Sequence, residues 1–405
     1  MGSSVASSLV TTPGRVLMLG TFGMKPKGTM SARAAGIAST LQSVGWQAKI
    51  VTTPWDNPED AGASIDYQGV PVMNTRVIRP VLWPLPVLEM VAFARRFQPD
   101  VVHLFKPKGF GDLAARLLRR MGYPVVVDMD DWEGSGGWND VLPYSALQRR
   151  VFDWQERTWP VQASAMTVAS QTLYYRAIEL GANANAVMYL PNALPESRIR
   201  QLRNPPTRPH GSYLALSDNP ATNILLYTRF VEFDPAFAVD VLARTLNRIP
   251  DARLVVAGSS ADGSSERRLL DHAHKAGVAS QIVFLGWIYP EDLGWIARQC
   301  SAALVLFDDT IINRAKCSVK LLELIACGIP VVASAVGENR HYLAEAVAGN
   351  LARPADPGHH ADLLVEAVSS LTGSRRISPS YAYPAHWGES IGGLAELYKS
   401  TISRH

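Results

Sequence analysis

Short apolar runs alternate with helical patterns along most of the chain, and this alternation restricts the possible folds more than any other feature. The runs predict six strands before residue 200, at residues 15–19, 47–52, 100–104, 124–128, 165–168 and 187–190. Helical patterns lie between them at residues 30–44, 112–121 and 171–180. Strands that alternate with helices indicate an α/β fold, with a parallel sheet and helices on both of its faces.

The alternation stops at residues 204–220 and then begins again. These residues, N-P-P-T-R-P-H-G-S-Y-L-A-L-S-D-N-P, are rich in proline and polar side chains and have no period, which is typical of a linker. Five further strands are predicted, at residues 223–228, 253–257, 281–285, 302–306 and 330–333. A chain of 405 residues is also too long for one ordinary core. We therefore expect a flexible end at 1–14, α/β domains at 15–200 and 221–380, and a linker at 201–220.

The last segment, residues 381–405, is expected to form a helix that leaves the second domain. A proline-marked break at Pro384 is followed by apolar residues at helical spacing, namely Ile391, Leu394, Leu397 and Tyr398. We expect this helix to pack back on the first domain.

Composition places the chain among globular proteins, with 47% hydrophobic and 19% charged residues. The formal net charge of +3 neither requires nucleic acid nor excludes a membrane surface, and we expect no nucleic-acid partner. The three cysteines form no C-x-x-C pair and are too few for a disulfide framework, which favours a reducing cytoplasm. No apolar run reaches the length of a membrane span, and the first residues lack the basic segment of a signal peptide.

In open parallel sheets, ligands bind beyond the carboxyl ends of the strands. After the first predicted strand comes G-T-F-G-M-K-P-K-G-T, in which Gly23, Lys27 and Gly28 precede a helix. Backbone N–H groups and a helix N-terminus there could receive an anion. The spacing matches neither G-x-G-x-x-G nor a P-loop, so an ordinary glycine turn is an equal interpretation.

The loops after the third and fourth strands combine charged and aromatic side chains. Their candidate ligand-binding residues are His103, Lys106, Asp130, Asp131, Trp132 and Trp138. Carboxylates beside indoles suit hydroxyl-rich ligands, whose rings stack on tryptophan while their hydroxyls need acceptors. Two alternatives remain open. The acids could cap the following helix, or the D-x-D triplet could hold a divalent metal ion.

Polar residues also follow the strands of the second half. Arg229 follows the first of these strands, where its fork of donors suits a phosphate, although a surface salt bridge is an equal interpretation. Backbone at Gly258 and Ser259 could approach a phosphate after the next strand. The loop before residue 321 adds mixed charges ahead of a helix, which suit a ligand with hydroxyls and phosphates; its candidates are Asp308, Asp309, Lys316 and Lys320.

Glu323 lies in the run K-L-L-E-L-I-A-C-G-I-P-V-V-A-S, within an apolar helix. A buried carboxylate is costly unless something pairs with it. Lys320 lies three positions earlier and faces the same way.

This run, followed by A-V-G-E-N, resembles the donor-site signature of the GT-B glycosyltransferases, in particular the large retaining family four. Further similar motifs follow one another in the family's order over most of the chain: V-V-H, V-A-S-Q-T-L, Y-L-P-N-A, L-L-Y-T-R-F, L-V-V-A-G-S, I-V-F-L-G-W and H-W-G-E-S. The resemblance implies two Rossmann-like domains facing each other across a cleft. It also implies a nucleotide-diphosphate sugar, bound mainly on the second domain, and neither a metal ion nor a cofactor.

The resemblance assigns roles to individual residues. Glu323 would accept hydrogen bonds from the ribose hydroxyls, and Arg229 would meet the diphosphate. Backbone near Gly258 and Trp287 would line the phosphate and the base. Ser170 and Asn192 would border the cleft. The acceptor, which is a glycan, a lipid or a small molecule, would lie on the side of the first domain.

The chain departs from the family pattern in three places. The glutamate usual eight positions before Glu323 is Ala315, and Asp308 or Asp309 is the expected substitute. The lysine usual five positions after Arg229 is Asp234, so that Lys316 or Lys320 would supply the charge. Where T-x-H-D is common, D-M-D-D places Asp130 at the position of the histidine.

We therefore expect a metal-independent glycosyltransferase that retains the anomeric configuration, with Arg229 and lysines stabilising the leaving diphosphate. Inversion would follow if Asp130 were a general base opposite the leaving group. The alternatives are a nucleotide-sugar epimerase, a metal-dependent transferase that uses Asp128 and Asp130, and a non-catalytic sugar-nucleotide or glycan binder. A nicotinamide-dependent oxidoreductase is the least favoured, since no dinucleotide fingerprint is present.

Membrane contact is a further possibility at the sequence level. The basic face of residues 113–120, with Arg116, Arg119 and Arg120, and the apolar stretch 81–91 could rest on an anionic membrane. A solvated helix face is the other interpretation. The expected location is the cytoplasm, including the inner face of the membrane.

Overall fold

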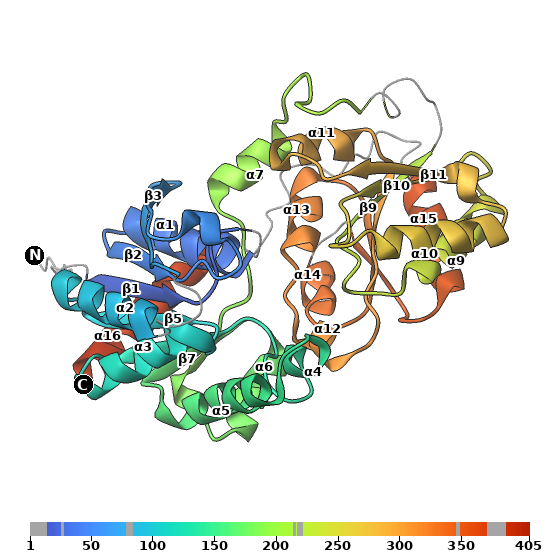
Figure 1. Cartoon of the computed structure of the whole chain (residues 1–405). Coiled ribbons are helices and arrows are strands. Elements are labelled where there is room, and N and C mark those ends of the chain that lie inside the picture. Colours follow the sequence, from blue (N-terminus) through green and yellow to red (C-terminus); the bar gives the residue numbers. More distant parts are fainter. Residues whose placement is uncertain are drawn as a thin grey trace, which may run out of the picture.

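The structure, a computed structural model, describes residues 14–25, 28–77, 84–213, 216, 222–345, 349–370 and 386–405. It consists of two α/β domains side by side, each built on a sheet with helices on both faces (Figure 1). The predicted α/β architecture of two parallel-sheet domains is confirmed. Several predicted features lie outside the described residues: most of the flexible end, Lys27, part of the 81–91 stretch, residues 214–215 and 217–220 of the linker, and residues 371–385.

The first sheet has eight strands in the order β3-β4-β2-β1-β5-β6-β7-β8. They are β1 (Arg15–Gly20), β2 (Gln47–Thr52), β3 (Ser64–Tyr67), β4 (Val70–Asn74), β5 (Val101–Phe105), β6 (Val125–Met129), β7 (Ala165–Val168) and β8 (Val187–Tyr189). All neighbours are parallel except β3 and β4, an antiparallel hairpin that the sequence patterns did not predict. Its turn at Gln68 and Gly69 has positive φ at both residues, as a two-residue hairpin turn requires.

Helices cover both faces of this sheet because successive side chains of a strand point to opposite sides. Leu17 and Leu19 of β1 pack towards α2 (Pro84–Phe97) and α3 (Gly109–Arg120), whereas Val16 and Met18 pack towards α1 (Ala35–Ser43). The remaining helical segments of the domain are η1 (Thr29–Ala34), η2 (Pro58–Asp60), α4 (Trp138–Val141), α5 (Ala146–Gln162), α6 (Gln171–Glu179) and η3 (Ala184–Ala186).

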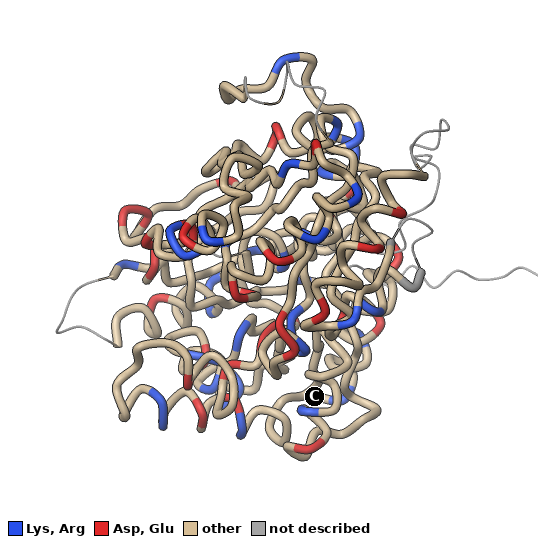
Figure 2. The backbone as a smooth tube through the Cα atoms, turned by 90° about the vertical axis from the view of Figure 1, so that its right-hand side faces the viewer, with Lys and Arg blue, Asp and Glu red and all other residues tan. Residues whose placement is uncertain are grey.

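The second sheet has six parallel strands in the order β11-β10-β9-β12-β13-β14. They are β9 (Asn223–Tyr227), β10 (Arg253–Ala257), β11 (Ile282–Gly286), β12 (Ala302–Val305), β13 (Val331–Ser334) and β14 (Gly349–Ala352). The helical segments are α9 (Pro235–Leu246), α10 (Ser264–Lys275), η4 (Ala279–Gln281), η5 (Pro290–Asp292), α11 (Leu293–Arg298), α12 (Ile311–Ala315), α13 (Val319–Cys327), α14 (Asn339–Glu345) and α15 (Pro357–Ser369). Basic and acidic positions are interspersed along this side of the backbone, in keeping with the small net charge (Figure 2).

The chain passes between the domains earlier than the predicted linker. Helix α7 (Glu196–Arg203) packs against α11 and α13 of the second domain. Gly294 of α11 lies so close to α7 that an added Cβ would meet the Leu202 carbonyl oxygen at 2.5 Å. The crossover therefore lies between β8 and α7, in residues 190–195, and not within residues 201–220.

The last helix, α16 (Trp387–Ser403), packs on the first domain. Trp387 is buried against Gly36, where an added Cβ would come within 2.6 Å of the indole Nε1. The hydroxyl of Tyr398 hydrogen-bonds Nδ1 of His103 at 2.6 Å, and Thr167 Oγ1 lies 3.1 Å from the other ring nitrogen. His103 is therefore a fully buried core residue and cannot reach a ligand, in contrast to the expected place beside the cleft.

We predict that Tyr398→Phe lowers the free energy of unfolding by about 1–3 kcal/mol, because it leaves a buried imidazole nitrogen without its partner. Urea denaturation followed by circular dichroism measures this loss. Tyr175→Phe, at an exposed tyrosine of α6, is the matched control and should leave the midpoint unchanged. Equal midpoints for both variants would contradict the structural role of the Tyr398 hydroxyl.

Candidate functional site

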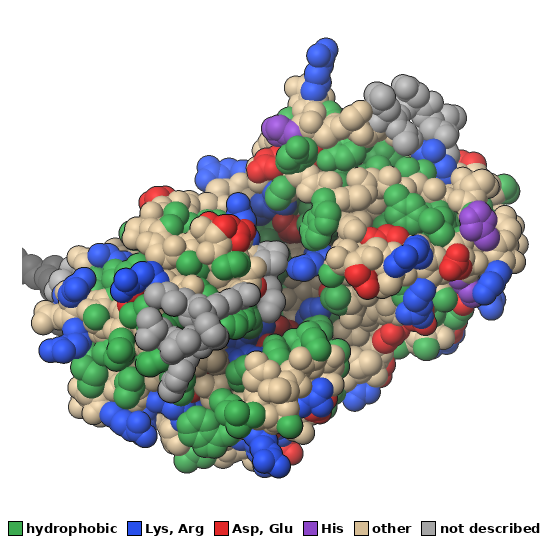
Figure 3. All heavy atoms as spheres, viewed as in Figure 1, with side chains coloured by type: hydrophobic (Ala, Val, Ile, Leu, Met, Phe, Trp, Pro, Cys, Tyr) green, Lys and Arg blue, Asp and Glu red, His purple; other side chains and the backbone are tan. Residues whose placement is uncertain are grey.

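The two domains meet across a hollow in which basic side chains are visible (Figure 3). The loops that follow β6 and β12 approach each other there. The Lys316 ammonium lies 5.5 Å from the ring centre of Trp138, which belongs to α4 of the other domain. The half-buried Trp138 belongs to the acidic loop of the first domain, which contains Asp130, Asp131 and Glu133. It thus lies next to the basic loop of the second domain, which contains Lys316.

Lys106 organises the acidic loop. Its backbone has a positive φ of 63°, and its ammonium lies 2.8 Å from Asp131 and 3.0 Å from Glu133. Burial lowers the pKa of Lys106, but Asp130, Asp131 and Glu133 outweigh burial and raise that pKa well above its ordinary value. Lys108 holds the other oxygen of Glu133 at 2.5 Å. The loop therefore presents a fixed arrangement of carboxylates around two buried lysines.

Asp130 is the acid of this loop with an unoccupied buried oxygen. Its Oδ2 accepts a hydrogen bond from Thr29 at 2.7 Å. Its Oδ1 lies 3.9 Å from the Lys106 ammonium and accepts no hydrogen bond from the described residues. Burial raises the pKa of Asp130 to about 6; Lys106 opposes this rise, and the neighbouring acids Asp131 and Asp128 add to it. This oxygen is suited to accept a hydrogen bond from a ligand hydroxyl.

Asp128 is fully committed to the protein. Arg33 donates to its two oxygens at 2.8 and 2.6 Å, and Thr167 donates at 2.5 Å. Arg33 also donates to the Asn192 side chain at 3.0 Å. Both oxygens of Asp128 therefore have hydrogen-bond donors within the protein, and Asp128 is the structural partner of Arg33.

Asn192 fastens the crossover segment to the second domain. Its side-chain amide donates to the carbonyl of Cys317 at 2.7 Å, and its backbone N–H lies 3.0 Å from the Cys317 sulfur. The Tyr342 hydroxyl donates to the Asn192 carbonyl at 2.7 Å. Asn192 lies at the domain boundary, where the sequence placed it, with its polar groups bound to protein.

The basic loop of the second domain is arranged around Glu232, which the sequence reasoning did not select. Its Oε1 lies 2.9 Å from the Lys316 ammonium and 3.5 Å from that of Lys320. Burial alone would raise the pKa of Glu232, but Lys320 and Lys316 outweigh burial and lower the pKa to about 2. The sequence pattern that could have identified Glu232 is the fragment T-R-F-V-E after β9, which places this acid three residues after Arg229.

Positive charge exceeds negative charge in this loop. Burial lowers the pKa of Lys320, and the neighbouring cations Lys316 and Arg229 lower it further, although Glu232 opposes them. Arg229 lies over the exposed ring of Trp287 at 5.8 Å. Lys316 and Lys320 contact Glu232, and Arg229 lies near enough to Lys320 to affect its pKa, so these four side chains carry a formal net charge of +2, which suits a doubly charged anion.

Asp308 and Asp309, the expected substitutes for the missing glutamate, lie at the surface and have partners within the protein. Both are exposed. The Asp309 carboxylate is held by Arg314 at 2.6 and 2.9 Å, and that of Asp308 accepts from the backbone N–H of Asp234 at 3.1 Å. Glu232, rather than Asp308 or Asp309, is the acid that contacts Lys316 and Lys320.

Gly258 allows the ends of β9 and β10 to approach closely. Its φ is 118°, and an added Cβ would lie 1.9 Å from the carbonyl oxygen of Thr228, so only glycine fits. The Ser259 hydroxyl donates to Glu266 at 2.6 Å, and the N–H of Ser260 donates to the same oxygen at 2.7 Å. Glu266, in the first turn of α10, thereby fixes this loop beside Arg229.

Glu323 has a partner within the chain. Its Oε1 accepts hydrogen bonds from Arg198 Nε at 2.8 Å and Nη2 at 2.6 Å. Arg198 also donates to the Pro290 carbonyl at 2.9 Å and to Gln201 at 2.6 Å. Among the described residues nothing hydrogen-bonds Oε2. The sequence could not reveal this pair, because it depends on α7 packing on the second domain.

The other candidates have mainly structural contacts. Ser170 is buried and caps α6 through a bond from the Leu173 N–H at 3.1 Å. The N–H of Gly23 donates to Asp56 at 2.8 Å, and Gly28 lies exposed before η1. Trp132 is buried and donates to the Ser135 carbonyl at 2.8 Å. Trp138 is therefore the indole of this loop that faces the second domain.

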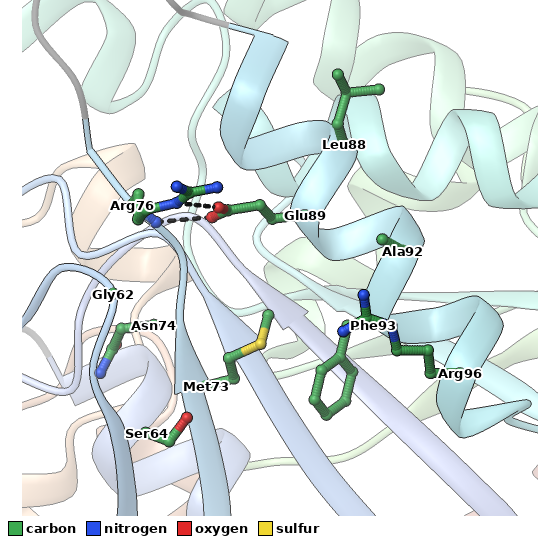
Figure 4. A pocket seen from close by; sticks show the side chains of 10 residues that line it. All are labelled: Gly62, Ser64, Met73, Asn74, Arg76, Leu88, Glu89, Ala92, Phe93 and Arg96. Carbon is green, nitrogen blue, oxygen red and sulfur yellow. Dashed lines mark hydrogen bonds and ion pairs between the residues drawn. The ribbon is translucent and has the colours of Figure 1, made fainter.

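A separate cavity of about 490 Å³ lies in the first domain between the β3–β4 hairpin and α2 (Figure 4). Arg76 and Glu89 form an ion pair at 2.5 Å beside it. The buried amide of Asn74, which also lines the cavity, has no hydrogen-bond partner among the described residues. None of the predicted site residues lines this cavity.

Two features concern metals and membranes. Over the ranges that the structure describes, no three His, Cys, Asp or Glu side chains are grouped so that they could hold a metal ion. Over the same ranges, no helix has both the length and the apolar composition needed to cross a bilayer.

Two family models match the chain, one for each domain. A Glycosyl transferase 4-like domain matches residues 28–193, and a Glycosyl transferases group 1 domain matches residues 227–378. The D-inositol 3-phosphate glycosyltransferase of Mycolicibacterium gilvum is 27% identical over 194 residues, which are 47% of this chain and 42% of that protein. The match thus spans less than half the length of this curated relative.

Solved structures share the fold over almost the whole chain. Sucrose-phosphate synthase from Thermosynechococcus elongatus has 17% sequence identity and a TM-score of 0.68, covering 97% of this chain and 100% of that one. Anabaena HepE in complex with UDP has 17% identity and a TM-score of 0.65, covering 96% of this chain and 100% of that one. Likeness at this identity shows the fold.

We predict that Glu232→Gln lowers the free energy of unfolding by roughly 3 kcal/mol at pH 7, because a carboxylate with a depressed pKa stabilises the folded state once it is ionised. This contribution is present above the ordinary pKa of 4.5 and is lost as the pH falls through about 2. Urea denaturation of both proteins at pH 7 and at pH 3 should therefore give a smaller difference at pH 3. The exposed Glu59→Gln is the control. A difference that is independent of pH would contradict the ion pairs.

Proposed function

We propose that this chain, which belongs to the family-four-like glycosyltransferases of the GT-B fold, transfers a sugar from a nucleotide-diphosphate sugar to a hydroxyl acceptor. The observation that carries the proposal is the pair of lysines, Lys316 and Lys320, on Glu232, with Arg229 near Lys320. These residues follow strands of the second sheet, and Lys316 contacts the ring of Trp138 in the loop of the first domain that carries the carboxylates. Two such complementary halves suit a substrate with a diphosphate at one end and hydroxyls at the other.

The donor that we propose is a UDP-sugar. Solved structures of HepE contain UDP and UDP-glucose, which supports this choice. The excess positive charge around Glu232 would compensate the two negative charges of a diphosphate. Glu323 would hold the ribose through Oε2, since Arg198 already occupies Oε1.

Catalysis in this proposal is electrostatic. As the bond from the sugar to the diphosphate breaks, negative charge develops on the leaving phosphate oxygen. Cations already fixed in a partly dry site stabilise this charge without further reorganisation. We propose that the protein's own cations serve this role and that neither a metal ion nor a cofactor is needed. Full activity in excess chelator is the expected result.

We further propose that the transfer retains the anomeric configuration. The departing phosphate oxygen would take the proton of the acceptor hydroxyl on the same face of the sugar ring. Asp130 would then accept a hydrogen bond from a substrate hydroxyl through Oδ1. If Asp130 instead removed the acceptor proton on the opposite face, the product would be inverted. The anomer observed by NMR decides between these two outcomes.

We place the reaction in the cytoplasm, which the three unpaired cysteines favour.

We predict that saturating UDP-glucose raises the unfolding temperature of the protein by several degrees, because a ligand that binds only the folded state stabilises it by mass action. Glu323→Gln and Lys320→Met should each reduce this shift while the unliganded protein stays folded. Arg268→Met, at an exposed arginine of the same domain, is the matched control and should keep the full shift. A full shift in both Lys320→Met and Glu323→Gln would contradict the donor site.

We predict that kcat/KM falls about tenfold per pH unit below about pH 6, because Asp130 must be ionised to accept a hydrogen bond through Oδ1. Above that pH, kcat/KM should reach a plateau. The pH–rate profile of Asp130→Asn should lack this decline and show a lower plateau. Asp153→Asn is the control for a general loss of acid residues. An unchanged profile in Asp130→Asn would show that another group titrates.

A further inference from the structure

The outer side of α5 carries apolar side chains that no other described part of the chain covers. Leu147, Val151, Trp154 and Val161 are 72%, 38%, 47% and 72% exposed. Their spacing places them on one side of the helix, where they form an apolar stripe. Helix α5 runs along the lower edge of the first domain in Figure 1, and apolar side chains gather there in Figure 3.

Basic residues flank this apolar stripe. Arg150 and Arg157 lie on α5 itself, one helical repeat of seven residues apart, and are exposed. The other exposed arginines of α5 and the adjacent α3 are Arg119, Arg120 and Arg149. The acids of these two helices contribute little negative charge to the surface. Asp112 and Glu156 are buried, and Asp153 is paired with Arg157 at 3.5 Å.

Arg116 shows why this surface differs from the one that the sequence suggested. It is buried between the two helices, where it binds Asp112 at 2.8 Å, Thr158 at 2.8 Å and Gln162 at 3.0 Å. Its guanidinium also lies 4.1 Å from the ring centre of Trp154. The expectation that Arg116 faces a membrane is therefore wrong. Arg116 instead fixes α5 against α3 and holds one face of the exposed Trp154.

We propose that the α5 surface, formed by the apolar stripe and its flanking arginines, docks on an anionic lipid surface. An apolar face of Leu, Val and Trp with arginines beside it is the composition of helices that lie in a membrane interface. Tryptophan suits this position because its ring is apolar and its N–H is polar. Each arginine near an anionic leaflet adds attraction that salt screens. The docking is independent of the proposed sugar transfer.

Charge disfavours a second copy of the chain as the occupant. In a two-fold contact the same surface meets itself, so the arginine row of one copy would lie near that of the other. Like charges at such a contact repel, and the interface would have to desolvate them. An anionic lipid surface presents the opposite charge.

The test is co-sedimentation of the whole chain with vesicles at low salt. Wild type should bind vesicles of equal parts phosphatidylglycerol and phosphatidylcholine, and should bind phosphatidylcholine vesicles at least tenfold more weakly. The double variant Leu147→Ser with Val161→Ser should reduce binding to the anionic vesicles about tenfold. Arg150→Gln with Arg157→Gln should reduce it similarly and weaken its salt dependence.

Val44→Ser with Val231→Ser removes two exposed apolar side chains outside both the α5 surface and the 81–91 stretch and is the matched control, expected to bind as wild type does. Circular dichroism and thermal unfolding should show that all variants fold. Three results would overturn the proposal: equal binding of wild type and the Leu147/Val161 variant, a loss confined to the control, or a dimer of wild type that this variant dissolves. The last result would assign the surface to a second copy.

Discussion

The buried ion pair between Arg33 and Asp128 is the interaction on which the arrangement of the site depends. Taking both groups out of water is costly, and the cost is offset only while each keeps its hydrogen bonds. The third guanidinium nitrogen of Arg33 donates to Asn192, which is hydrogen-bonded in turn to Cys317 of the second domain. The pair therefore connects the end of β6 to the crossover segment and, through that segment, to the loop that carries Lys316.

The site depends on contacts such as these, between segments that lie far apart in the sequence, whereas a strand can be identified from its own residues. The fold was therefore easier to predict than the site. A buried parallel strand such as V-V-H-L-F is a continuous apolar run whatever packs on it, so local pattern is enough to identify it. The strands β3 and β4 lack such a run, because they form an edge hairpin with half-exposed residues. The sequence therefore predicts the sheet cores and misses this edge, and it also misses β14, the edge strand of the second sheet.

Site residues were predictable where the chain position alone decides their place. Arg229, Gly258 and Trp138 follow strands; Trp138 contacts Lys316 of the other domain, and Gly258 lies against Thr228, the residue before Arg229. Other assignments depend on which helix packs on which domain. Arg198 reaches Glu323 only because α7 belongs to the second domain, and His103 is enclosed only because α16 returns to the first. The periodicity of one segment does not show which distant segment packs against it.

In both halves of the site, side chains of like charge lie close together and are buried. Burial and neighbouring acids raise the pKa of Asp130, and burial and neighbouring cations lower that of Lys320. Each shift means that the charged form is disfavoured in the protein alone. A diphosphate beside Lys320 and a hydroxyl donor beside Asp130 would each favour the charged form. A ligand with both groups would therefore favour the charged forms of Asp130 and Lys320 at once. The two halves cannot do this for each other while Lys106 and Glu232 hold them in place.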